Sequence, residues 1–195
     1  MKFIRNLLAL IGLVTVVIVA MVGVKVAPMV DQLRQFDAQA LDTYKELGQR
    51  LLAEGDAASA TVWKVKVADG LSADDVATSM RYIANEHNIK NVGELPLYKQ
   101  VAAMSGEAYR HAEIFMFCNA LTAARMMDFN DAYSAYLPCR VSLVEDKEGN
   151  LWLYSLNMDL MIHGGKELPP ELKEEALGVK RIILDIMNRG AKGEF

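Results

Sequence analysis

Cysteine and histidine are scarce in this chain of 195 residues. It contains two cysteines, Cys118 and Cys139, and three histidines, His87, His111 and His163. So few cysteines exclude a disulfide-dense scaffold. The spacings among these residues match no zinc motif, and the chain lacks the Cys-x-x-Cys-His motif that attaches haem. We therefore predict no metal site and no cofactor.

Catalytic signatures are missing as well. The chain has no GxGxxG turn, no Walker loop and no Ser-His-Asp signature. These absences favour a binding or accessory protein over an enzyme.

Positive charge is sparse beyond the N-terminus. The formal net charge is −4, and residues 1–29 hold Lys2, Arg5 and Lys25 but no acid, so residues 30–195 carry −7. Nucleic-acid binding requires a basic face. We therefore expect no nucleic-acid partner.

A long apolar run occupies the N-terminus. Residues 7–24 carry no charge, and about 20 apolar residues suffice to span a bilayer. Because Lys2 and Arg5 precede the run, the positive-inside rule places the N-terminus in the cytoplasm. We predict that residues 1–29 form a single-pass anchor in the inner membrane and that the rest lies in a bacterial periplasm. A cleaved signal peptide is the alternative, and it too would export the domain.

Residues 30–60 form the predicted stalk and linker. Within 30–52, apolar residues recur at steps of three or four, and Asp37 is assigned to the solvent-facing side. The stripe comprises Val30, Leu33, Phe36, Ala40, Tyr44, Leu47 and Leu51. This helix either packs on its own domain or forms a dimeric coiled coil.

Residues 61–195 are predicted to fold as one α+β domain. We expect a small mixed or antiparallel sheet with helices packed on one face, ending in a helix that Pro169 and Pro170 open. The predicted strands are 61–68, 111–118, 139–144 and 151–154, and the predicted helices are 72–86, 97–105, 120–127 and one from 170 to about 190. Residues 88–96 are a turn with room for a short strand, and 128–137 are a loop.

The middle of the domain resembles the DUF302 family, also called TT1751-like. The resemblance covers residues 62–165, and its most specific part is the Pro138-Cys139 pair that opens a strand. It implies a small α+β domain that tends to dimerise and whose biochemical role is not established. The family often has Asn-Pro at the start of the central helix, whereas Asn119 is followed here by Ala120.

The candidate functional residues are Cys139, Cys118, Arg140, Asn119 and His111. Cys139 is a small buried hydrophobe, half of a disulfide with Cys118, or a thiol that binds or reacts. Neighbours along a strand point to opposite faces, so Arg140 need not lower the pKa of the Cys139 thiol, and His111 does not pair with Cys118.

Methionine is the remaining source of possible ligands. Its clustering suggests copper or haem ligation as an alternative, but we interpret these residues as core filler. The cluster comprises Met104, Met116, Met126, Met127, Met158 and Met161. His163 is expected in a loop.

Three hypotheses for function follow from these features. The first is a membrane-anchored periplasmic binding or accessory module, expected to be a homodimer. The second is a thiol-based redox or sulfur-handling protein centred on Cys139. The third is a non-catalytic subunit of a larger membrane complex, with Gly12 and Gly23 offering packing surfaces in the anchor.

Overall fold

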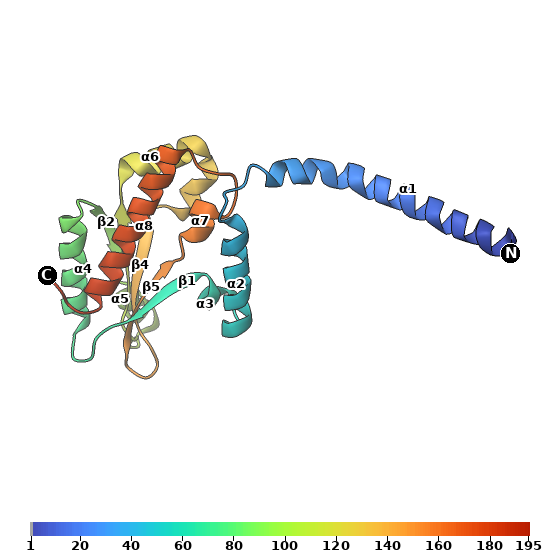
Figure 1. The fold of residues 1–195 in the computed structure, drawn as a ribbon. Coiled ribbons are helices and arrows are strands. Elements are labelled where there is room, and N and C mark those ends of the chain that lie inside the picture. The colour runs from blue at the N-terminus through green and yellow to red at the C-terminus, as the bar shows by residue number, and fades with distance from the viewer. Residues whose placement is uncertain (1) are drawn as a thin grey trace.

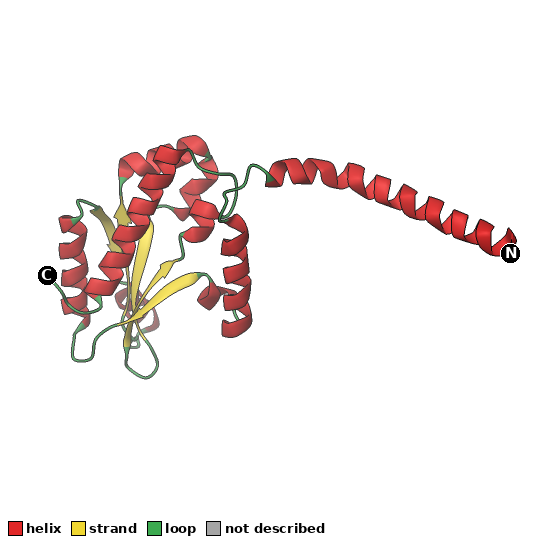
Figure 2. Cartoon of the chain, viewed as in Figure 1, coloured by secondary structure: helices red, strands yellow, loops and turns green. Residues whose placement is uncertain are grey.

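The protein combines one five-stranded antiparallel sheet with helices around it and a long N-terminal helix (Figures 1 and 2). This computed structural model describes residues 2–195. The strands lie in the order β1-β5-β4-β3-β2. Their bounds are β1 Val62–Lys66, β2 Lys90–Leu95, β3 Ala112–Cys118, β4 Cys139–Glu145 and β5 Leu151–Leu156. The predicted α+β class is confirmed.

Eight α-helices and one short 3₁₀ helix, η1, complete the described part of the chain. Their bounds are α1 Lys2–Leu33, α2 Ala40–Glu54, α3 Ala57–Ala60, α4 Ala73–Glu86, α5 Leu97–Ser105, α6 Ala120–Phe129, η1 Asp131–Tyr136, α7 Asp159–His163 and α8 Pro170–Gly190.

The inner face of the sheet carries the largest side chains of the core. Phe115 and Phe117 of β3 are fully buried, because alternate residues of a strand point to the same face. Phe115 is paired with Val141 of β4, and Phe117 is paired with Cys139. This register places Cys139 on the inner face, at the point where β4 begins.

Helices α4 and α8 cover that inner face together. Ser72 and Asp75 form a capping box that starts α4, so the first turn of this helix is satisfied by side chains. Met80 of α4 lies against Gly190 of α8, where an added Cβ would come within 2.7 Å of the Met80 side chain. The glycine therefore sets how closely the two helices approach.

Helix α1 is long and apolar enough to cross a membrane. Its most apolar stretch of 18 residues has a mean hydropathy of 3.0, and none of that stretch is buried within the protein. Figure 1 shows the helix extending away from the domain. The expected anchor at residues 7–24 lies inside it.

The predicted stalk helix over residues 30–52 is not continuous. The chain leaves α1 after Leu33 and re-enters a helix at Ala40, and Phe36 forms an antiparallel bridge with Lys166 in between. Asp37 is buried in this break, so its assignment to the solvent-facing side was wrong. The reason is a set of partners on α7 and α8 that local periodicity does not reveal.

Those partners form a buried polar cluster around Asp37. Its Oδ2 lies 2.5 Å from Lys173 Nζ, and its Oδ1 lies 3.2 Å from His163 Nδ1 and accepts the Gln39 N–H at 2.9 Å. Burial alone would raise the pKa of Asp37, but Lys173, Gln39 and His163 hold it below its ordinary value. His163 is thus buried at the end of α7 rather than in a loop.

Two further predictions differ from the structure, one in secondary structure and one in burial. Residues 128–137, predicted as a loop, contain the end of α6 and the 3₁₀ helix, whose first turn is capped by the Asn130 side chain. Met104, predicted in the core, is 90% exposed on α5. Neither difference disturbs the order of the main strands.

Candidate functional site

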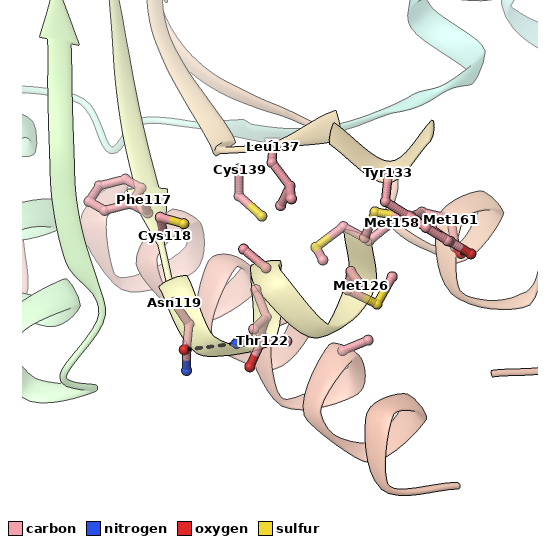
Figure 3. A pocket seen from close by; sticks show the side chains of 13 residues that line it. Phe117, Cys118, Asn119, Thr122, Met126, Tyr133, Leu137, Cys139, Met158 and Met161 are labelled. Atoms are coloured by element: carbon pink, nitrogen blue, oxygen red, sulfur yellow. Dashed lines mark hydrogen bonds between the residues drawn. The ribbon is translucent and has the colours of Figure 1, made fainter. Parts of the chain in front are cut away.

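A pocket opens at the end of the sheet where β3 stops and β4 starts (Figure 3). Its cavity volume is about 30 Å³, which suits only a small guest. The lining comes from β3, α6, η1, β4, α8 and the segment around α7. It comprises Phe117, Cys118, Asn119, Thr122, Ala123, Met126, Tyr133, Leu137, Cys139, Met158, Met161, Ala176 and Val179.

The β3–α6 junction places Cys118 and Asn119. The Asn119 side-chain oxygen accepts the backbone N–H groups of Leu121 and Thr122 at 3.2 and 3.3 Å, which caps α6 at its first turn. The strand therefore ends at Cys118. The Cys118 side chain lines the pocket. Figure 3 shows both cysteines on one side of the pocket and the labelled methionines on the other.

The two cysteines lie close together because antiparallel β3 and β4 meet at this end. Both are free thiols in the structure. Burial, with a smaller contribution from the nearby Cys118, raises the pKa of the Cys139 thiol to about 11 against the opposing field of Arg140. Burial also raises the pKa of Cys118. Both thiols are therefore protonated at neutral pH, which makes them poor nucleophiles.

The oxygens of the pocket are already engaged. Tyr133 donates its hydroxyl to the Met161 carbonyl at 3.1 Å, and Thr122 donates to Glu175 at 3.0 Å. The Asn119 oxygen is used by the helix cap. With these oxygens engaged, what the lining mainly offers a guest is apolar surface and sulfur.

The predicted site residues separate into two groups. Cys118, Cys139 and Asn119 line this pocket, whereas Arg140 is exposed and lines an adjoining hollow. His111 precedes β3 at its far end, where its ring lies 4.6 Å from that of Tyr98. Seven residues of strand separate it from the thiols, a span of about 20 Å.

Sequence reasoning missed the methionines as part of this site. Met126, Met158 and Met161 were assigned to the core, and Met126 and Met158 are indeed buried. Nothing in their spacing shows that the three face one cavity together with two thiols. The available signal was their number, since methionine is frequent in adaptable binding surfaces.

A family model described as "Domain of unknown function DUF302" matches residues 63–190. The chain belongs to the DUF302 family. The match includes α8, so the DUF302 domain extends beyond the resemblance over residues 62–165. It contains the whole lining of the pocket.

A solved structure supports the fold of the DUF302 domain. An uncharacterised conserved DUF302 protein from Bacillus stearothermophilus aligns with a TM-score of 0.54 and 15% sequence identity, covering 66% of this chain and 97% of that one. At this identity the likeness concerns the fold alone. No curated protein matches the chain.

Proposed function

We propose that this protein is a membrane-tethered binding module whose ligand occupies the pocket between β3, α6, β4 and α7. The observation that carries the proposal is the lining, which is mostly apolar and in which the oxygens of Asn119, Thr122 and Tyr133 are already hydrogen-bonded. Such a surface suits a small guest that needs no hydrogen bonds. The ligand is therefore small and apolar or binds sulfur.

Xenon tests this proposal because it enters apolar cavities and makes no hydrogen bonds. We expect xenon to shift the ε-methyl NMR signals of Met126, Met158 and Met161 in the full-length protein in detergent. The methyl signal of Met104, which is 90% exposed, should stay in place. Ala123→Leu fills the pocket and should abolish the shifts. Equal shifts at Met104 and the pocket methionines, or none in the wild type, would contradict a pocket that binds ligands.

The tether in this proposal is α1, with the N-terminus in the cytoplasm and the domain in the periplasm. Lys2 and Arg5 ahead of the apolar run support this orientation. We also propose that the protein is a homodimer through α2. Its exposed stripe comprises Leu41, Tyr44, Leu51 and Leu52. The anchor would confine two such stripes to one membrane and so favour their contact.

The double variant Leu41→Asp/Leu52→Asp tests the dimer. Burying a leucine is worth about 1.5–3 kcal/mol, so losing two per chain should weaken dimerisation at least tenfold. The measurement is sedimentation of the full-length protein in mild detergent. Gln49→Asp/Ala53→Asp adds the same charge to exposed positions of α2 outside the stripe and should leave the dimer intact. A monomeric wild type contradicts the dimer, and co-purified proteins identified by mass spectrometry would favour a subunit of a larger complex.

A redox role for Cys139 is less well supported, because its pKa is raised to about 11. We expect Cys139 to react with a disulfide reagent slowly at pH 7, and about tenfold faster for each pH unit up to that pKa, since the thiolate is the nucleophile. Labelling kinetics of the Cys118→Ser and Cys139→Ser variants separate the two thiols. Rapid labelling of Cys139 at pH 7, or a reducible bond between the cysteines, would reverse this preference.

A further inference from the structure

Five sulfur atoms from separate parts of the chain surround one pocket. Cys118 ends β3, Cys139 begins β4, Met126 lies on α6, and Met158 and Met161 lie at α7. In Figure 3 the two thiols lie on the left of the pocket and the three thioethers on the right. Thiolate and thioether groups are the ligands that soft metal ions prefer, Cu(I) above all when thioethers take part.

An adjoining cavity also shows that Cys139, Met158 and Met161 are close neighbours. All three line both this pocket and the adjoining hollow next to Arg140. They therefore form the wall between two cavities. A metal ion on the pocket side of this wall would lie near the Cys139 thiol and the Met158 thioether, with Cys118 on the same pocket lining.

Hard ions find no comparable ligands here. The pocket lining contains no carboxylate and no imidazole. Its hydroxyl groups donate hydrogen bonds to the Met161 carbonyl and the Glu175 carboxylate. Mg²⁺ and Ca²⁺ require several oxygen ligands, and zinc sites with fewer than four thiolates are completed by histidine or carboxylate rather than thioether. The chemistry of the lining therefore favours a soft, sulfur-seeking ion over a hard one.

We propose that the pocket binds one Cu(I) ion, with Cys118 and Cys139 as thiolate ligands and Met158 as a thioether ligand. This inference rests on the proposed binding function and names its ligand class. Each thiol gives its proton to solvent when it binds, so Cu⁺ and two thiols yield a bis-thiolate centre with one net negative charge and two protons. Arg140 lines the adjoining hollow together with Cys139 and Met158, and its positive charge offsets this negative charge.

The test is an anaerobic titration of the full-length protein in detergent with Cu(I), in competition with the chromophoric chelator bicinchoninate. We expect one Cu(I) per chain and an affinity that rises about tenfold per pH unit for each displaced proton, hence about a hundredfold. Cys139→Ser and Cys118→Ser should lose competition with the chelator, and Met158→Leu should weaken it. Met104→Leu, at an exposed methionine, should leave it unchanged. X-ray absorption at the copper edge should show sulfur neighbours alone.

Several outcomes would overturn the Cu(I) site. These are no competition by the wild type, binding that survives Cys139→Ser, tighter binding of Zn²⁺ than of Cu(I), or equal Cu(I) affinity of the urea-unfolded chain. The last outcome would show adventitious binding to two thiols without a built site. The xenon experiment keeps the two proposals apart, because xenon binding without Cu(I) binding removes this inference and retains the binding pocket.

Discussion

Replacing Lys173 with Met is expected to destabilise the folded protein by up to about 3–5 kcal/mol, because it removes the ammonium group that pairs with a buried carboxylate. The Asp37 side chain is completely buried, and Lys173 Nζ lies 2.5 Å from it. After the substitution, His163 and the Gln39 N–H remain as its partners. Urea unfolding followed by the fluorescence of Trp63 and Trp152 measures the loss.

Two further variants decide whether the buried charge is the cause. Lys192→Met removes a lysine whose side chain is 65% exposed, and its ion pair with Glu194 is expected to contribute less than about 1 kcal/mol. Asp37→Asn combined with Lys173→Met removes the buried charge and should recover part of the stability. If the double variant is no more stable than Lys173→Met alone, the unpaired carboxylate is not responsible.

Acid should weaken the same cluster. The pKa of Asp37 in the folded protein lies below its ordinary value of 3.8, so the unfolded state binds a proton first as the pH falls. The stability contributed by Asp37 is therefore complete above about pH 5 and is lost as the pH falls through its folded pKa. Asp37→Asn should show a smaller loss of stability over this range than the wild type does.

The Asp37 cluster also shows which contacts cannot be predicted from local sequence patterns. The strand at β3 and the helices α4 and α8 follow from alternation, capping residues and the apolar stripe, which are all local signals. Asp37 was assigned to solvent because a carboxylate in a helical pattern is normally exposed. Its partners His163 and Lys173 come from the other end of the chain. Only the packing of α7 and α8 brings them to it.

The pocket could be predicted only in part, because local patterns indicate the strands but not how the helices pack on them. A disulfide between Cys118 and Cys139 was one of the predicted alternatives, which requires the two residues to be close. The register between β3 and β4 does bring them close, but both are free thiols. The orientation of Met126 and Met158 depends on how α6 and α7 pack against the sheet. Periodicity reports that such residues are buried but does not report which cavity they face. The sulfur-lined pocket is therefore a tertiary feature.

Replacing Phe117 with Ala should cost about 3–5 kcal/mol and open the pocket toward the core. The Phe117 side chain is fully buried and lines the pocket next to Cys139, with which it is paired across the sheet. Phe115→Ala is the matched control, because Phe115 is equally buried on the same strand and the same face but does not line the pocket. We expect both variants to lose similar amounts of stability in urea unfolding.

The two variants should differ in the chemistry of Cys139. Removing the Phe117 ring lets water reach the thiol, which lowers the desolvation that raises its pKa. Labelling of Cys139 in a Cys118→Ser background should therefore be faster for Phe117→Ala than for Phe115→Ala at a temperature where both remain folded. Because both variants unfold with similar ease, transient global unfolding accelerates labelling equally and cancels in the comparison. Equal labelling rates would mean that Phe117 does not control access to the pocket.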